Sequence, residues 1–245
     1  MESTQRLLCE ITIDASPDVV WTALRDPAQI QEWFGWQYDG LSDEIQGIFF
    51  SDVAADGEHA LRWPHGDVIA LQRNGNRTVV QTFRPTADSD SMREQAADID
   101  EGWLAFVEQL RFWLNRHRDE QRATVFLSGA AREPNASVAE ALGLAVASAT
   151  NSRYEAVLNS GEVLSGEVWA RHGNVTCLTV DSYGDGLIVL VNHDSQRHPP
   201  HGGGMVTLTT FGLSPERFEE IRASWASTWA SKYEPSPDFG AEVPA

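Results

Sequence analysis

Three histidines form the most concentrated set of candidate ligating side chains in this sequence. His193, His198 and His201 lie in one short segment that is rich in proline and glycine. Neutral imidazoles are ligands for zinc and nickel. However, no carboxylate motif accompanies them, and the prolines restrict how the three rings can converge on one ion. A solvated hairpin loop is therefore the favoured interpretation, and no metal site is predicted.

A second set of polar side chains, in predicted strands and in a long helix, contains candidates for orienting a ligand. The members are His59, Arg62, Gln81, Arg84 and Gln109. For His59 and Arg62 the favoured interpretation is a surface position. Strand alternation places His59 and Arg62 on opposite faces, so both cannot point inward without a bulge. The sequence contains no phosphate-binding loop, no dinucleotide-binding glycine motif and no zinc-protease helix motif. Catalytic residues therefore stay unassigned, no cofactor is expected, and a non-enzymatic role is favoured.

The apolar candidates are bulky aromatic side chains of the first half, together with one leucine. The predicted ligand-binding residues are Trp33, Phe34, Trp36, Phe50, Trp63, Phe83, Trp103, Phe106 and Leu110. Small-molecule sites are mostly apolar, with a few polar groups that fix orientation. The same rings can instead fill the core, because protein interiors are densely packed. The sequence leaves both interpretations open.

Composition limits the partners of the chain. Its net charge is −18, with 17 arginines and one lysine, Lys232. A surface this acidic repels phosphates, so neither nucleic acid nor an anionic membrane is expected as a partner. Cys9 and Cys177 are too few for a disulfide framework or a cysteine zinc site. No secretory signal and no apolar run of ~20 residues is visible. A cytoplasmic protein is predicted, and a homodimer is left open.

The long helix predicted from Asp98 to Arg118 is the element around which the first half is organised. Asp98 and Glu101 match a capping box. Apolar residues then recur at spacings of three and four, which is typical of a helix with one buried face. They are Ile99, Trp103, Phe106, Val107, Leu110, Trp113 and Leu114. A curved sheet must pack around so bulky a stripe.

Upstream of this helix, the pattern predicts the order β-α-α-β-β-β-β-β-α. A strand over residues 7–13 is followed by helices that begin at Pro17 and Pro27, a favoured first position. A polar loop is expected over residues 86–97. Further strands are predicted at residues 36–39, 45–51, 59–63, 68–73 and 77–84.

The second half repeats this plan, which indicates a divergent duplication. Its predicted strands cover residues 122–131, 154–158, 162–170, 175–182, 186–192 and 205–211. Ser214 and Pro215 then begin a second long helix, with an inner stripe of Phe218, Ile221, Trp225 and Trp229. The predicted domains are residues 1–118 and 122–234, and residues 235–245 are predicted to be a loose tail.

The first half also resembles a known family. The residues that carry the resemblance are Pro17, Val20, Trp21, Asp26, Pro27, Ile30, Trp33, Phe34, Gly102 and Trp103. In this order they resemble the SRPBCC (START/Bet v 1-like) superfamily, and within it proteins similar to the C-terminal domain of the Hsp90 activator Aha1, the AHSA1 family. The resemblance covers about residues 5–117. It implies an α+β fold of two tandem helix-grip domains, each a curved antiparallel sheet around a long C-terminal helix.

Three functions follow as hypotheses. The first is binding of a small apolar or aromatic ligand in a cavity of the first domain. The second is a cyclase or aromatase of polyketide type, because tandem domains of this superfamily look like such enzymes. The third is activation of an Hsp90-type chaperone, which would make that chaperone the partner. The last rests on fold-level analogy alone.

Overall fold

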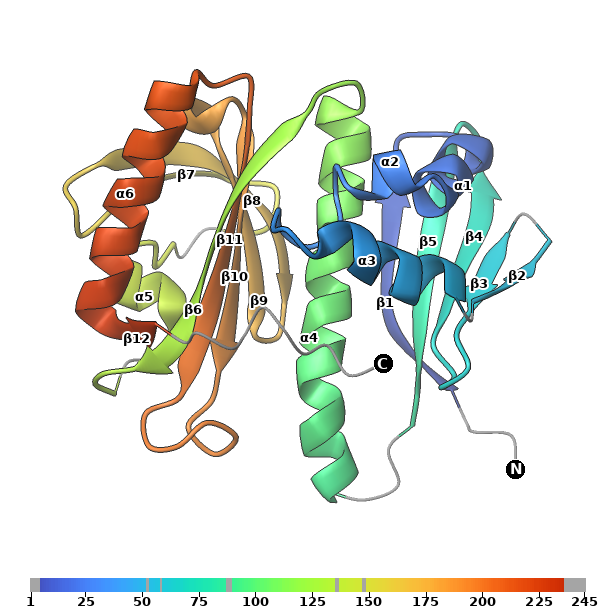
Figure 1. Ribbon diagram of the computed structural model, residues 1–245, viewed down its shortest axis with the longest axis horizontal. Helices are drawn as coiled ribbons and strands as arrows, with labels where there is room; N and C mark the ends of the chain where they lie inside the picture. Colours follow the sequence, from blue (N-terminus) through green and yellow to red (C-terminus); the bar gives the residue numbers. More distant parts are fainter. Residues whose placement is uncertain are drawn as a thin grey trace. The chain divides into compact units, whose positions relative to one another are not determined.

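The computed structural model describes residues 5–51, 53–57, 59–86, 90–134, 137–146 and 149–235. The chain divides between Glu120 and Gln121 into two compact units, called here unit 1 and unit 2. Each unit consists of an antiparallel sheet and a long helix near its C-terminal end (Figure 1).

Unit 1 contains a five-stranded sheet in the order β1-β5-β4-β3-β2, with every neighbouring pair antiparallel. Its strands are β1 (Gln5–Ile13), β2 (Ala54–Asp56), β3 (Ala60–Arg62), β4 (Val68–Asn74) and β5 (Arg77–Pro85). Its helices are α1 (Pro17–Arg25), α2 (Pro27–Ile30), α3 (Leu41–Gln46), the π-helical turn η1 (Gly47–Ser51), α4 (Asp90–Phe112) and the π-helical turn η2 (Trp113–His117). The long helix α4 packs against β1.

The two strands predicted at residues 36–39 and 45–51 are wrong. The first range has no regular structure, and the second falls on the end of α3 and on η1. Leu41, Ile45 and Phe49 explain the difference, because they follow one another at spacings of four and are all buried. That spacing places them on one helical face, which outweighs the β-branched and aromatic composition of the segment.

The long helix begins earlier than predicted. α4 starts at Asp90, eight residues before the predicted cap at Asp98, so the segment expected to be a loop is largely helical. The residues between are mostly strong helix formers such as Met92, Arg93 and Ala96. Their helical propensity prevails, although the segment lacks an apolar stripe of its own.

Unit 2 contains a seven-stranded sheet in the order β12-β6-β11-β10-β9-β8-β7. Its strands are β6 (Arg122–Ala131), β7 (Arg153–Val157), β8 (Val163–His172), β9 (Val175–Val180), β10 (Gly186–His193), β11 (Gly203–Phe211) and β12 (Tyr233–Pro235). Its helices are α5 (Val138–Leu142), the short turn η3 (Asp181–Tyr183) and α6 (Pro215–Lys232). A bulge between Val168 and Ala170 interrupts the β8–β9 register, and bulges of this kind bend a sheet.

Helix α6 matches its prediction closely. The Ser214 hydroxyl accepts a hydrogen bond from the Arg217 amide at 3.3 Å, and Pro215 occupies the first turn. The predicted stripe faces the core: Ile221, Trp225 and Trp229 are buried. Three residues after the helix, Tyr233–Pro235, pair with β6 as β12. The rest of the predicted tail lies outside the described residues.

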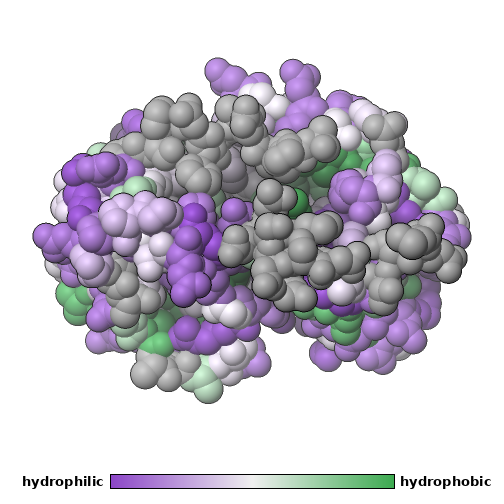
Figure 2. Space-filling view, turned by 90° about the horizontal axis from the view of Figure 1, so that it is seen from below, coloured by the Kyte–Doolittle hydropathy of each residue, from purple (hydrophilic) through white to green (hydrophobic). Residues whose placement is uncertain are grey.

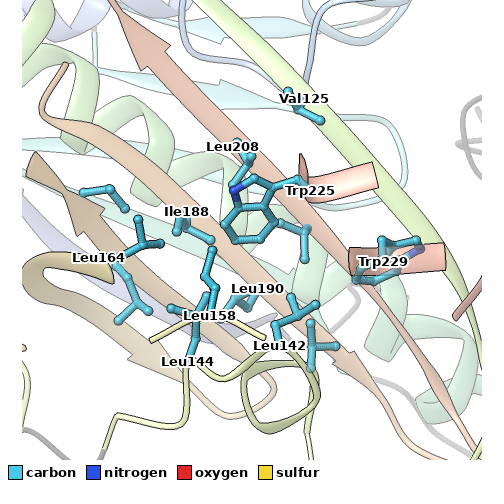
Figure 3. Packing of buried hydrophobic residues seen from close by; sticks show 14 of the residues in the cluster. Val125, Leu142, Leu144, Leu158, Leu164, Ile188, Leu190, Leu208, Trp225 and Trp229 are labelled. Atoms are coloured by element: carbon cyan, nitrogen blue, oxygen red, sulfur yellow. The ribbon is translucent and has the colours of Figure 1, made fainter. Parts of the chain in front are cut away.

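The core of unit 2 lies between α6, α5 and the inner face of the sheet. Trp225 and Trp229 extend from α6 toward aliphatic side chains of the strands and of the segment around α5 (Figure 3). The surrounding residues include Leu142, Leu144, Leu158, Leu164, Ile188, Leu190 and Leu208. Two indoles and a layer of leucines thus fill the space under the helix.

The two units share one topology. In each unit the first strand pairs antiparallel with the strand that directly precedes the long helix, β1 with β5 and β6 with β11. The remaining strands continue from there as a meander, and the long helix packs against the first strand. This arrangement confirms the predicted α+β class of two tandem helix-grip units.

The visible surface agrees with the acidic composition. In the space-filling view, the described face is mostly hydrophilic, and hydrophobic residues form only small patches (Figure 2). Among the described residues, no helix has the length and apolar character needed to cross a bilayer.

Two glycines of unit 2 offer a matched test of backbone geometry. Gly184 and Gly173 both have positive φ, at +70° and +54°. A Cβ atom at Gly184 would overlap the carbonyl oxygen of Phe211, whereas a Cβ at Gly173 meets nothing within 4 Å. We expect Gly173→Ala to lower the free energy of unfolding by about 1 kcal/mol, through backbone strain alone. Gly184→Ala should cost roughly 2 kcal/mol more, because the strand must move. Urea unfolding of both variants would measure the difference, and equal costs would contradict the overlap.

Candidate functional site

Six aromatic side chains from four parts of unit 1, including α4 itself, come together on one side of α4. We call this group the aromatic cluster, and its members are Trp33, Phe34, Phe49, Trp63, Trp103 and Phe106. The first two follow α2, Phe49 lies in η1, Trp63 follows β3, and the last two belong to α4. Five of the nine predicted ligand-binding residues are therefore in contact with one another in the structure.

The rings of the aromatic cluster pack mainly edge to face. Phe49 lies at the centre, with ring centroids 5.7 Å from Trp33, 5.1 Å from Phe34 and 6.1 Å from Trp63. Trp63 and Trp103 are 5.0 Å apart. Edge-to-face pairs at these distances are favourable, because the positive edge of one ring meets the negative face of the next.

Hydrogen bonds fix the orientation of the three indoles in the aromatic cluster. Trp33 Nε1 donates to the Ala23 carbonyl at 2.9 Å, and Trp63 Nε1 donates to the Ile48 carbonyl at 2.7 Å. Trp103 Nε1 donates to a carboxylate, Asp67 Oδ2, at 2.9 Å. Most buried indole N–H groups in proteins have such a partner. The rings are thus held in set directions from the backbone and from one acidic side chain.

Four predicted ligand-binding residues lie elsewhere. Leu110 is fully buried on α4, and Trp36 is half-buried with its ring 6.2 Å from that of Tyr38. Phe50 is half-buried and packs under the Arg25 guanidinium, 4.8 Å from its ring centroid. Its neighbour Phe49, which the sequence analysis did not select, takes the central place in the aromatic cluster. The spacing of four residues between Ile45 and Phe49 is the sequence signal that identifies Phe49 as a buried helical residue.

Phe83 lies on the face of β5 opposite to the buried one. Thr78, Val80, Thr82 and Arg84 of that strand are buried, whereas Phe83 lies between two of them in the alternation and is half-buried. Side chains of neighbouring residues in a strand point to opposite faces. Phe83 therefore does not share a face with the residues that pack beneath α4.

A network of charged side chains borders the aromatic cluster at Trp103. The Arg84 guanidinium donates through Nη1 to Asp67 Oδ1, and through Nε to Asp100 Oδ1 at 3.0 Å. Arg6 adds a second ion pair to Asp100. Asp67 is 1% exposed and Arg84 is 7% exposed, so the central pair is almost fully removed from water. We call Arg6, Asp67, Arg84 and Asp100 the polar network. It links β1, β5 and the turn before β4 to α4.

The five polar side chains that the sequence analysis selected differ in burial. Arg84 and Gln109 are buried, and Gln109 Nε2 donates to the Gly35 carbonyl at 2.9 Å. His59 and Arg62 are exposed. Gln81 lies on the same face as Phe83 and donates to Glu10 at 2.7 Å. Two of the five residues thus lie on the side of the aromatic cluster. The sequence analysis did not select Asp67 or His65, which share the short turn after Trp63.

Cys9 of unit 1 is a free thiol that is buried on β1. Burial raises its pKa to about 11, because the thiolate would lose its hydration. At neutral pH the thiol is therefore protonated, and Cys9 contributes apolar volume to the sheet instead of a nucleophile.

The histidine-rich segment of unit 2 brings two of its three imidazoles together. The rings of His193 and His198 stack with centroids 4.5 Å apart. Asp194 accepts the backbone amides of Gln196 and Arg197. The amide of Arg197 and its guanidinium lower the pKa of Asp194 to about 2. In the part of the chain that the structure describes, no three His, Cys, Asp or Glu side chains are arranged to hold a metal ion.

Comparisons with known proteins add three similar structures. No protein-family model matches this chain, and no curated protein matches it significantly. Among solved structures, the chain is similar to a protein from the dynemicin biosynthetic locus, at 17% identity over 94% of this chain and 95% of that chain, with a TM-score of 0.33. It is similar to the di-domain ARO/CYC StfQ of the steffimycin biosynthetic pathway, at 10% identity over 91% of each chain and a TM-score of 0.32.

The third similar structure covers a single unit. It is an AHSA1-like protein of Rhizobium etli, at 20% identity over 47% of this chain and 84% of that chain, with a TM-score of 0.35. At such identities and TM-scores, these matches assign no activity to this chain. The strand order and the helices of the chain itself establish its architecture, a tandem pair of helix-grip units.

Proposed function

We propose that unit 1 binds a small apolar or aromatic molecule at the aromatic cluster. The observation that carries this proposal is the set of six rings with fixed indoles, bordered at one end by the polar network. Ligand sites combine an apolar lining with a few polar groups that fix orientation. Aromatic rings at defined angles favour a planar guest, which can meet their faces and edges.

Phe106 marks the place where such a molecule would enter. It is half-buried on α4, as is Gly102 one turn before it, whereas Trp103 is buried between them. Gly102 has no side chain, so no side chain from the preceding turn of α4 covers the Phe106 ring. Phe106 is the outer member of the aromatic cluster, because the other five rings are buried. Its ring contacts Phe34 with centroids 4.4 Å apart.

Enlarging Phe106 tests the proposal. We expect Phe106→Trp to weaken binding of the neutral probe N-phenylnaphthylamine at least tenfold, because the larger indole occupies the entry point. The probe's fluorescence rises when it leaves water, so a titration gives the dissociation constant. Phe50→Trp is the matched control: it makes the same change at a half-buried site outside the aromatic cluster. The Phe50→Trp variant should bind the probe with the same affinity as the unchanged protein.

Native mass spectrometry of gently purified protein gives an independent measurement. A reproducible adduct would support ligand binding and would identify the chemical class of the ligand. Unchanged probe affinity in a folded Phe106→Trp variant would place the site elsewhere. Absence of any saturable binding in the unchanged protein would mean that the aromatic cluster is only a packed core.

A further inference from the structure

The turn between β3 and β4 brings an exposed histidine onto a buried aspartate. The Trp63 amide donates to the Asp67 carbonyl at 3.0 Å, and the Gly66 amide donates to the Trp63 carbonyl at 2.9 Å. Gly66 has a φ of +102°, and a Cβ there would lie 2.9 Å from the Pro85 ring. Only glycine fits this position without strain. These contacts fix the backbone of the turn that carries His65.

His65 and Trp103 meet the same carboxylate oxygen. His65 Nε2 lies 3.0 Å from Asp67 Oδ2, and Trp103 Nε1 donates to that atom at 2.9 Å. The two ring nitrogens are thus within about 6 Å of each other. His65 therefore stands at the edge of the aromatic cluster, although its side chain is 55% exposed, whereas that of Asp67 is 1% exposed.

Asp67 determines which nitrogen of His65 is basic. The other carboxylate oxygen, Asp67 Oδ1, accepts a hydrogen bond from the Arg84 guanidinium. A carboxylate only accepts hydrogen bonds, so a neutral His65 donates through Nε2 and carries its lone pair on Nδ1. An imidazole oriented by a buried carboxylate is the arrangement that makes a general base.

We propose that His65 and Asp67 form a general-base dyad that removes a proton from a molecule at the aromatic cluster. The substrate class is an aromatic or apolar compound with an acidic C–H or O–H bond. His65 Nδ1 accepts the proton, and Asp67 acts as the positioning residue that holds the ring and stabilises the imidazolium. This inference depends on the proposed function for the place where the compound binds, but not for the hydrogen bond that orients His65.

Nitrobenzisoxazole is a suitable probe, because it is planar and needs only a base. His65 Nδ1 takes the proton from the ring carbon beside nitrogen, and the C–H electron pair forms the nitrile. The N–O bond breaks, and its electron pair goes to the phenolate oxygen. His65 then releases the proton to water, so the reaction balances without a co-reactant. The nitrophenolate product is coloured and can be followed directly.

The experiment compares four proteins: the unchanged chain and its His65→Gln, Asp67→Asn and His59→Gln variants. We expect His65→Gln to lower kcat/KM about 100-fold, the usual contribution of a general base. Asp67→Asn should lower kcat about tenfold while KM stays the same, and an unchanged circular dichroism spectrum would show that the lower rate does not come from unfolded protein. His59→Gln is the matched control at an exposed histidine, and its rate should not change.

The titration with N-phenylnaphthylamine separates this inference from the proposed function. If the probe binds but turnover does not depend on His65, the dyad is refuted and ligand binding stands. If turnover depends on His65 but no saturable binding occurs, the dyad stands and the aromatic cluster is not the ligand site. A rate equal to that of free imidazole at the same concentration, without probe binding, refutes both.

Discussion

Arg84→Met is expected to lower the free energy of unfolding by about 3–5 kcal/mol, the usual cost of removing one partner from a buried ion pair. Methionine retains most of the length of the side chain but removes its charge and donors. Asp67, which is 1% exposed, then lacks the guanidinium that compensates a buried carboxylate. Trp103 and His65 remain as donors, but neither replaces a full positive charge.

The double variant Asp67→Asn, Arg84→Met provides the decisive comparison. Neutralising Asp67 removes the uncompensated charge, while the amide oxygen of asparagine can still accept from Trp103. The double variant should therefore be more stable than Arg84→Met alone, which is a strongly non-additive result. Arg62→Met is the control, because the Arg62–Asp56 pair is 51% and 67% exposed and such pairs contribute less than about 1 kcal/mol.

These variants can be compared by urea unfolding followed through circular dichroism and tryptophan fluorescence. Two compact units need not unfold together, so each transition should be fitted separately. The loss is expected in the transition of unit 1 alone. A cost for Arg84→Met no larger than that for Arg62→Met would mean that the central pair of the polar network does not stabilise the fold.

Trp225→Ala should destabilise unit 2 by about 3–5 kcal/mol, as expected when a buried tryptophan is truncated. The indole is 2% exposed and lies against the leucine layer under α6 (Figure 3). Its Nε1 also donates to the Tyr183 hydroxyl at 2.9 Å, and that hydroxyl donates to Glu162 Oε2 at 3.0 Å. Burial raises the pKa of Tyr183, so its hydroxyl stays protonated as a donor.

Trp225→Phe separates packing from hydrogen bonding. Phenylalanine retains an aromatic ring but not the N–H, so its cost should fall between those of the unchanged protein and Trp225→Ala. Arg222→Ala, on the same helix, is the surface control, because its pair with Glu219 is more than half exposed on both sides. It should change stability by less than about 0.5 kcal/mol. Equal midpoints for Trp225→Ala and Arg222→Ala would contradict a filled core under α6.

Local sequence pattern predicts some helices completely, but it leaves η1 and the faces of the strands undetermined. α6 follows from Ser214, Pro215 and a stripe at spacings of three and four, all within one segment. η1 shows the limit of such reasoning. Its Ile48, Phe49 and Phe50 have the composition of a strand, and the helical spacing is visible only when Leu41 and Ile45 are included.

The strands share a different ambiguity. On β5, alternation separates Val79, Gln81 and Phe83 from Thr78, Val80, Thr82 and Arg84, but it does not say which set faces the core. The set with Phe83 looks the more apolar, yet the buried set contains an arginine. A buried arginine is acceptable only because Asp67 and Asp100 come to it from the turn before β4 and from α4. Its burial depends on partners 17 and 16 residues away in sequence.

The sequence by itself determined the tandem plan, the long helices and five of the six members of the aromatic cluster, because hydrophobic period and helix signals act over a few neighbouring residues. Only the tertiary structure decided the faces of the strands, the central place of Phe49 and the convergence of His65, Arg84 and Trp103 on Asp67. Those contacts arise from strand register and from the packing of α4, which join residues distant in sequence.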